Sequence, residues 1–526
     1  MNQIARLMHS VFGKPLMVFS LMIIAIGLPI SPFLVSAGQM LLALNYLLEG
    51  DVKYKIHQLK SNKVIWLFLL LPLIHVIWLA NTSDFAYALS DLKIKVPLVV
   101  FPIIIGTSRS LSLKQLQWVL LTFVFGVFCG SVVSVSILTG IYPLDYLDIR
   151  DISIFISHIR FGLMLVFSLV IISFYTIKNW LTISKTDKIG IGLILTWFLL
   201  FLIILQSLTS WVVMMFLGLS LFVIYYKRIK NILIRKTLLI ILASVMIFWV
   251  SIVCVVFFNF YFKPSVDLSK LPKYTQQGNL YVNDLRSKEK ENGNRVFIQI
   301  CYDELKTEWG KVSEYDMMGK DKKGNSLRYT LIRYLTSKGL TKDSVGMSKL
   351  DQIDINLIES GYASIVHRNK FIPYIKIYEL VWEIDNYLRA DNANKKSVAQ
   401  RFEYLKAGIF IIKNNFLFGV GTGDLQNEFN NGYEKLDSNL LNKYQHRAHN
   451  QYLTFFITFG IIGFVLSLLS LFGPAYKSLT KLNILLISFL LIVFTSMMNE
   501  DTLETQAGVT FYIMFYTILL FSNKKK

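Results

Sequence analysis

The chain has 526 residues, of which 54% are hydrophobic and 14% aromatic, and its mean hydropathy is +0.50. This composition indicates an integral membrane protein and excludes an ordinary soluble enzyme. The formal net charge is +20. Most of the excess basic residues fall in short segments between apolar runs on one side of the predicted membrane topology, so nucleic acid is not needed to explain the charge.

Twelve apolar runs are predicted to be transmembrane helices: residues 16–29, 33–48, 64–80, 96–106, 116–139, 159–177, 189–205, 210–226, 237–261, 452–473, 482–498 and 508–522. The first run has no small-residue cleavage site after it, so we expect an uncleaved helix. Pro29 and Pro32 mark the turn between the first two runs. The fourth run is short, and Pro97 and Pro102 predict that it is broken or re-entrant.

The charge distribution predicts the orientation of these runs. Lys and Arg dominate the short segments on the side of the N-terminus, and acidic residues dominate the short loops on the other side. Both termini are therefore expected in the cytoplasm. The fold class that follows is an all-α polytopic membrane protein with a large, mainly helical extracytoplasmic loop. Its predicted parts are an N-terminal bundle (1–261), the loop domain (262–451) and C-terminal helices (452–526).

The loop domain contains three segments with a helical pattern, at 325–338, 350–360 and 371–388, and Gly339 is expected to end the first of them. Residues 263–293 are polar and weakly patterned, which predicts a strand pair or irregular structure. The acidic loop 500–504 either approaches a site at the outer surface or only satisfies the charge rule.

Residues 401–463 contain most of the candidate reactive and binding residues. Ser397 and Gln400 fit a capping box that begins an amphipathic helix. Its apolar face is predicted from three- and four-residue spacing to comprise Phe402, Leu405, Ile409, Ile412 and Phe416. The glycine-rich segment 419–424 then ends the helix. Its glycines serve either to turn the chain or to present backbone amides to an anion, and turning is the preferred interpretation.

His449 and Asn450 stand directly before the apolar run that begins at residue 452, so the imidazole is expected near the membrane surface. It is either a cap or interfacial histidine or a general base, because imidazole accepts protons near neutral pH. The nearby Arg447 and Asn450 either contact phosphate or sugar or are solvated loop residues. Glu403 and Asp424 are candidates for orienting an arginine or the base.

Two arginines are predicted on the same outer surface. Arg160 lies at the outer edge of the sixth run, just after His158, and Arg401 opens the amphipathic helix. A cation at the edge of an apolar span is either an interfacial anchor or a functional group. Guanidinium groups bind phosphate oxygens in bidentate fashion, so the pair is suited to a lipid pyrophosphate. The histidines lack the spacing of a zinc site, and we expect neither a metal nor another cofactor.

Several motifs together resemble one known family. Arg401, the run GVGTG at 419–423, HNQYL at 449–453 and FGIIG at 459–463 resemble the C-terminal signature of the O-antigen ligase and O-antigen polymerase superfamily. The runs HIRF at 158–161 and RYLTSKG at 333–339 resemble its Bacteroidetes branch. One departure is Trp211, where many relatives carry an arginine after a serine at the start of the corresponding helix.

The resemblance implies a membrane glycosyltransferase of the GT-C type in the bacterial inner membrane, with its large loop in the periplasm. The implied donor is a glycan on undecaprenyl pyrophosphate, and the implied acceptor is the lipid A-core oligosaccharide. His449 would be the base, and Arg401 and Arg160 would hold the pyrophosphate. The remaining expected substrate contacts are His158, Arg333, Glu403, Arg447 and Asn450.

Other functions remain open from the sequence. A polysaccharide polymerase or a protein O-oligosaccharyltransferase would keep the chemistry and change the acceptor. A lipid-linked glycan flippase or transporter belongs to a different class, and it should carry ionisable groups or paired broken helices near the membrane midplane. The predicted spans are nearly free of charge, and the polar candidates gather at the outer face.

Overall fold

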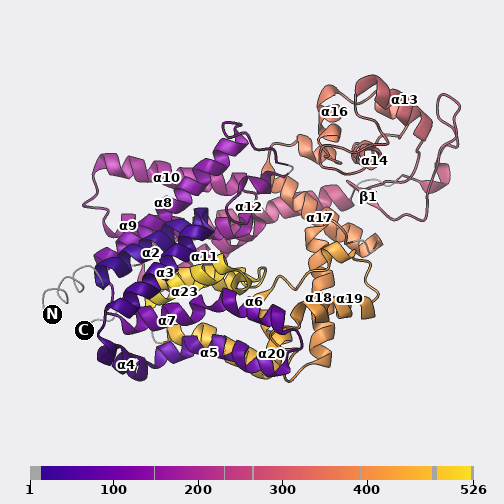
Figure 1. The fold of residues 1–526 in the computed structure, drawn as a ribbon. Coiled ribbons are helices and arrows are strands. Elements are labelled where there is room, and N and C mark those ends of the chain that lie inside the picture. The colour runs from indigo at the N-terminus through magenta and orange to yellow at the C-terminus, as the bar shows by residue number, and fades with distance from the viewer. Residues whose placement is uncertain are drawn as a thin grey trace. The chain divides into compact units, whose positions relative to one another are not determined.

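The computed structural model describes residues 13–146, 148–229, 231–262, 266–390, 393–476 and 483–522. The chain forms two compact units. Unit 1 comprises Met1–Tyr226, Tyr404–Ser438 and Gln445–Lys526, and unit 2 comprises Lys227–Glu403 and Asn439–Tyr444. Figure 1 shows the chain as a ribbon coloured from the N-terminus to the C-terminus.

Unit 1 is built from helices. Their order along the chain is α2 (Lys14–Ile30), α3 (Pro32–Leu48), α4 (Val52–Ser61), α5 (Lys63–Ile77), η1 (Trp78–Asn81), α6 (Phe85–Lys95), α7 (Pro97–Thr107), α8 (Leu113–Leu138), η2 (Ile149–Ile152), α9 (His158–Lys178), α10 (Lys185–Ile204), α11 (Leu208–Tyr225), α19 (Leu425–Lys435), α20 (Gln451–Phe472), η7 (Gly473–Ala475), α22 (Ile484–Ser496), η8 (Thr502–Glu504) and α23 (Gln506–Phe521). The 3-10 helix η3 (Tyr226–Arg228) and helix α18 (Ser397–Asn414) cross the division between the units.

All twelve predicted apolar runs contain a helix within their described residues, and residue 482 of the eleventh run lies outside the described residues. Within the described ranges, seven helices are long and apolar enough to cross a membrane: α5 with η1, α8, α9, α10, α11 with η3, α12 (Ile232–Tyr261) and α20 with η7. The helices α2, α22 and α23 are apolar but shorter, and α3 meets α4 at an angle of 109°. The fourth run forms the 11-residue helix α7, which contains Pro102. The protein is thus all-helical in its apolar part, and twelve complete crossings stay a prediction.

Small residues allow close helix packing in unit 1. A Cβ atom added to Gly38 of α3 would lie 2.6 Å from Ile24 of α2, and one added to Gly126 of α8 would lie 2.7 Å from the carbonyl oxygen of Ile26. Such contacts are typical of helix interfaces in lipid, where packing replaces the hydrophobic effect as the main attraction. They bring α2, α3 and α8 together as one layer.

An aromatic cluster packs the C-terminal helices α22 and α23 against α8 and α9. Phe123 of α8, Phe167 of α9, Phe489 of α22 and Phe515 of α23 are all buried. The ring centroids of Phe123 and Phe515 are 4.8 Å apart, and those of Phe167 and Phe489 are 5.0 Å apart. Figure 1 also shows α5 beside α20, which the contacts between the two helices confirm. The C-terminal helices therefore belong to the same bundle as the N-terminal ones.

Unit 2 contains α12, η4 (Leu268–Lys270), the short antiparallel pair β1 (Lys290–Glu291) and β2 (Asn294–Arg295), α13 (Tyr302–Val312), α14 (Leu327–Ser337), α15 (Ser344–Met347), α16 (Gln352–Glu359), η5 (Ile365–Arg368), α17 (Ile372–Ala390) and η6 (Asn442–Tyr444). Its core includes Trp309, Leu331 and Ile358, which are all buried. The three predicted helices are confirmed as α14, α16 and α17. Gly339 has φ +71° after α14, as a glycine helix stop requires.

The predicted apolar face of α18 is the exposed one, and a second stripe of the helix is buried. Leu405 and Ile409 are 45% and 43% exposed, whereas Tyr404, Ala407 and Ile411 are buried. The buried face follows the spacing i, i+3 and i+7 equally well. Apolar periodicity therefore identified the helix, but it did not identify which of the two stripes is buried.

Candidate functional site

The start of α20 is anchored to the loop that follows α22. Asn450 caps α20, because its Oδ1 accepts a hydrogen bond of 3.0 Å from the backbone N–H of Leu453. Its Nδ2 donates to the carbonyl oxygen of Met498 over 2.9 Å, and the backbone N–H of Gln451 donates to Met497 over 2.9 Å. The side chain of Asn450, predicted to contact substrate, is thus engaged in holding two segments together.

The acidic loop, residues 500–504, also contacts the start of α20. Gln451 donates from Nε2 to Glu504 over 3.1 Å and accepts from the backbone N–H of Leu503 over 2.7 Å. Thr454 donates its hydroxyl to Asp501 over 3.0 Å. Burial raises the pKa of Asp501 to about 6, and the charge of Glu504 adds to the increase while Arg447 opposes it. The loop therefore packs directly on the start of α20.

Arg447 lies two residues before His449 and is held by Glu504. Its Nη1 lies 3.2 Å from Glu504 Oε2 and donates to the hydroxyl of Tyr87 over 3.0 Å. Burial on its own would raise the pKa of the Glu504 carboxyl. The positive charges of Lys95 and Arg447 instead hold that pKa well below its usual range. The arginine is fixed by a carboxylate that stays ionised.

A second buried cation shares the same carboxylate. Lys95 ends α6 and is only 2% exposed, and its amine pairs with Asp91 one turn earlier and with Glu504 at 3.1 Å. Burial would lower the pKa of Lys95, but the two carboxylates raise it. Burial also raises the pKa of Asp91 to about 7, with Lys95 opposing and Glu504 reinforcing the shift. Two cations and two carboxylates thus form one buried network.

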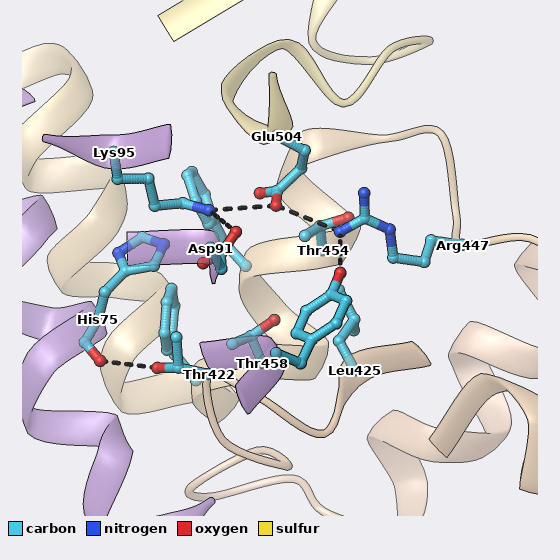
Figure 2. Close-up of a pocket in the computed structure, with 12 residues that line it drawn as sticks. His75, Asp91, Lys95, Thr422, Leu425, Arg447, Thr454, Thr458 and Glu504 are labelled. Atoms are coloured by element: carbon cyan, nitrogen blue, oxygen red, sulfur yellow. Dashed lines mark hydrogen bonds and ion pairs between the residues drawn. The ribbon is translucent and has the colours of Figure 1, made fainter. Parts of the chain in front are cut away.

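Figure 2 shows this network around a small cavity. Its lining also includes His75, Thr422 and Thr458, and Thr422 donates its hydroxyl to the carbonyl oxygen of His75 over 2.7 Å. The cavity volume is about 10 Å³, which is the room for about one water molecule. The network is therefore a support for the neighbouring loop, and a sugar does not fit inside it.

The glycine-rich loop turns and packs, as the preferred interpretation predicted. The backbone N–H groups of Val420 and Gly421 each donate over 2.9 Å, to the carbonyl oxygens of Ile457 and Thr458. Those carbonyls are free for this contact because α20 is kinked at Gly460, where φ is +62° and ψ is −172°. Because these two amides are used inside the protein, they are not available to an anion.

The Asp424 carboxylate binds backbone groups. Its two oxygens accept from the N–H groups of Ser83 and Asp84, over 2.6 and 2.8 Å. This places Asp424 at the junction between η1 and α6. Both contacts are structural, and among the described residues neither is to an arginine or a histidine.

His449 has a left-handed backbone, with φ +47°. Non-glycine residues rarely adopt this conformation, and where they do it often marks a functional position. The imidazole is half-buried, and its ring centroid lies 5.7 Å from that of Tyr404 and 6.3 Å from that of His446. The imidazole thus lies in a ring cluster with Tyr404 and His446, two residues after Arg447 and directly before the cap of α20.

Arg160 lies in the first turn of α9, after His158, and both are half-buried. The Nε of Arg160 is buried and has no hydrogen-bond partner among the described residues. Buried guanidinium N–H groups are normally paired, so an unpaired one indicates a site for an acceptor atom. The N-terminal end of the helix adds a favourable field for an anion.

A series of contacts connects α9 to the start of α20. A Cβ atom on Gly162 would lie 2.0 Å from the hydroxyl oxygen of Ser210, so α9 and α11 meet at their first turns. The preceding residue, Thr209, accepts a hydrogen bond of 2.6 Å from Asn499, which follows the Met498 that Asn450 contacts. Arg160 and His449 therefore belong to the same end of unit 1.

The remaining predicted residues lie in unit 2. Arg333 pairs with the buried Glu291 at 2.7 Å and stacks on Trp382, 4.1 Å from the ring centroid, so its guanidinium is engaged within the unit. Glu403 accepts a hydrogen bond of 2.5 Å from the hydroxyl of Tyr387. Arg401 is half-buried in α18. That Arg401 and His449 contribute to one site stays a prediction.

Sequence reasoning missed the buried network. The sequence pattern does not single out Asp91 or Lys95, and it leaves the loop that contains Glu504 with two interpretations. The available signal was the i, i+4 spacing of Asp91 and Lys95 on one helix directly before an apolar run. The partner Glu504 lies 409 residues away from Lys95, and no local pattern connects them.

The comparison with protein families agrees with these motifs. A family model described as O-antigen ligase matches residues 355–468, a segment that contains Arg401, the glycine-rich loop, Arg447 and His449. No curated protein sequence matches the chain. In residues 355–468 the chain carries the domain of the O-antigen ligase and polymerase superfamily, as the sequence motifs predicted.

Proposed function

We propose that the protein is a membrane glycosyltransferase that moves a glycan from undecaprenyl pyrophosphate to an acceptor hydroxyl, with His449 as the base. The observation that carries the proposal is the setting of His449. It lies in the matched family segment, has a left-handed backbone and stands beside an arginine fixed by a buried carboxylate. The fold supports the membrane location, because seven described helices are long enough to cross a bilayer.

In the proposed reaction, the acceptor oxygen attacks the anomeric carbon of the donor sugar. The carbon–oxygen bond to pyrophosphate breaks as the new glycosidic bond forms, and the acceptor proton passes to the His449 imidazole. Proton transfer to a placed histidine contributes about 10²–10⁴ in rate. Direct displacement in one step would invert the anomeric centre.

The leaving pyrophosphate needs fixed positive charge as its negative charge develops. Arg160 is suited to this role because its Nε is buried and lacks a partner among the described residues, at the N-terminal end of α9. Arg401 is proposed as the second contact. Arg447 is held by Glu504 and Tyr87, so we assign it the positioning of the His449 loop.

The proposed setting is the bacterial inner membrane, with twelve spans of the GT-C type, both termini in the cytoplasm and the site at the periplasmic side. The proposed acceptor is the lipid A-core oligosaccharide. A polymerase or a protein O-oligosaccharyltransferase would use the same residues with another acceptor, so the acceptor has to be chosen by experiment.

The test uses the purified full chain with a glycan on undecaprenyl pyrophosphate and three separate acceptors: lipid A-core, a second lipid-linked glycan and a serine-containing peptide. His449→Ala is compared with His446→Ala, because His446 is an exposed histidine of the same ring cluster. We expect transfer to lipid A-core, a loss of about 10²-fold or more in His449→Ala, and activity near wild type in His446→Ala.

The other results have distinct meanings. Transfer to peptide or to the second lipid-linked glycan alone would keep the chemistry and replace the acceptor. Wild-type activity in His449→Ala would remove His449 as the base. Transbilayer movement of the donor without any transfer would support a flippase and overturn the transferase.

A further inference from the structure

Unit 1 contains a second cavity, at the end of the bundle away from His449. It lies between α9, α11 and α22, has a volume of about 510 Å³, and includes Leu169, Ser173, Leu217, Leu221 and Ile484 in its lining. The α9 residues of the lining recur at three- and four-residue spacing from Val166 to Lys178, so they form one face of the helix. Apart from Ser173 and Lys178, all its lining residues are apolar.

The cavity has one closed end and one charged end. Toward the start of α9, residues 161–168 are all buried, so this face of the helix is covered by protein there. Toward the end of α9, Ile177 is 76% exposed and the exposed Lys178 lies 6.0 Å above the ring of Phe174. Among the described residues of the lining, Lys178 is the one cation, and it stands where the apolar surface becomes exposed.

The dimensions fit one leaflet of a bilayer. Residues 166–178 span about 18 Å at 1.5 Å per residue, and half of a 30 Å hydrocarbon core is about 15 Å. Beyond Lys178, the exposed Trp180 lies under the amine of Lys188 at 4.5 Å. Tryptophan and lysine side chains are typical of the membrane–water interface, which places the mouth of the cavity at headgroup level.

We propose that this cavity is a binding site for an anionic phospholipid, with one acyl chain between α9, α11 and α22 and the phosphate on Lys178. The charge at the mouth selects an anionic headgroup, and the apolar lining selects a hydrocarbon chain. Because Lys178 and His158 are at opposite ends of α9, the lipid belongs to the leaflet opposite the His449 site. With the proposed orientation, that leaflet is the cytoplasmic one, which is rich in anionic lipid.

The donor's polyprenyl tail is the competing occupant. It would have to reach the cavity from the end of α9 that carries Arg160, and the buried residues 161–168 cover that path on this face. The closed end thus favours a separate lipid that enters from the side of Lys178.

The experiment measures lipid binding to the purified full chain by native mass spectrometry, with dioleoyl phosphatidylglycerol and dioleoyl phosphatidylcholine as probes. Lys178→Gln removes the cation, and Ser173→Phe fills the cavity. Arg150→Gln and Ser220→Phe are controls, because both residues lie outside the lining and the exposed Arg150 precedes α9, at the end opposite to Lys178. Thermal melting with added lipid gives a second readout, since a ligand that binds only the folded state raises the melting temperature.

We expect one phosphatidylglycerol per chain, bound about fivefold more tightly than phosphatidylcholine. Lys178→Gln should abolish this preference, Ser173→Phe should weaken both lipids, and both controls should behave like wild type. Equal binding by all variants, or no headgroup preference in wild type, would overturn the proposal. Displacement of phosphatidylglycerol by undecaprenyl phosphate would assign the cavity to the donor tail instead. No transfer reaction is measured, so failure here leaves the proposed glycosyltransferase function untouched.

Discussion

Glu504 Oε2 lies 3.2 Å from Arg447 Nη1, and the same oxygen lies 3.1 Å from the amine of Lys95. One carboxylate from the loop before α23 thus joins the end of α6 to the segment that carries His449. The Glu504 side chain is only 6% exposed, so both cations depend on it in a region of low dielectric. Removing its charge would leave them competing for Asp91.

Glu504→Gln is therefore expected to destabilise the protein by about 3 kcal/mol, the range for one partner lost from a buried ion pair. The control is Asp148→Asn, which removes an ion pair to Arg150 whose side chains are 45% and 41% exposed, and which should cost less than about 1 kcal/mol. Thermal melting of the purified protein measures both. Equal melting of the two variants would show that the buried network is not a stability element.

Arg160→Lys tests the proposed pyrophosphate contact. The ammonium keeps the charge but loses the planar pair of donors that binds phosphate oxygens. We expect kcat/KM for the lipid-linked donor to fall about tenfold, mainly through KM, which corresponds to about 1.4 kcal/mol. Arg150→Lys, at an exposed arginine before α9, should retain activity. A normal KM in Arg160→Lys would contradict the role given to this guanidinium.

Gly460→Ala tests the kink in α20. With φ +62° and ψ −172° the backbone is in a region essentially restricted to glycine, and a Cβ atom would lie 2.3 Å from the carbonyl oxygen of Leu417. We expect Gly460→Ala to lower the free energy of unfolding by about 3 kcal/mol or more. Gly190 lies in α10 with nothing within 4 Å of an added Cβ, so Gly190→Ala should be stabilising by about 0.5–1 kcal/mol. A Gly460→Ala protein that melts like wild type would mean that α20 can straighten.

The raised pKa of Asp501 predicts that the stability of the folded protein depends on pH. Its pKa is about 6 in the folded protein, against 3.8 for the ordinary group. Between these two values the unfolded chain binds fewer protons than the folded protein, so the wild type loses stability as the pH rises. Asp501→Asn removes this titration and keeps an oxygen acceptor for Thr454. The melting temperature of the variant relative to wild type should therefore rise from pH 4 to pH 6 and then level off. A constant difference would show that Asp501 ionises normally.

The sequence alone was sufficient for features that depend on neighbouring residues. The helical character of the apolar runs and the helix stop at Gly339 were predicted correctly, whereas the break expected at Pro102 is absent from α7, which is one continuous 11-residue helix. These features follow from the periodicity of apolar residues and from the backbone preferences of glycine and proline. The family resemblance was also available, because its motifs are short and local.

Tertiary structure decided which face of α18 is buried, how the glycine-rich loop uses its amides, and which charges meet. Tyr404 and Ala407 are buried while Leu405 is exposed, although both stripes are apolar. Lys95 and Glu504 are separated by 409 residues in the sequence. A charged group takes its environment from whatever packs against it, and that partner is selected by the whole bundle. The residues that can bear chemistry are therefore visible in the sequence, whereas their pairing and pKa values arise only in the folded protein.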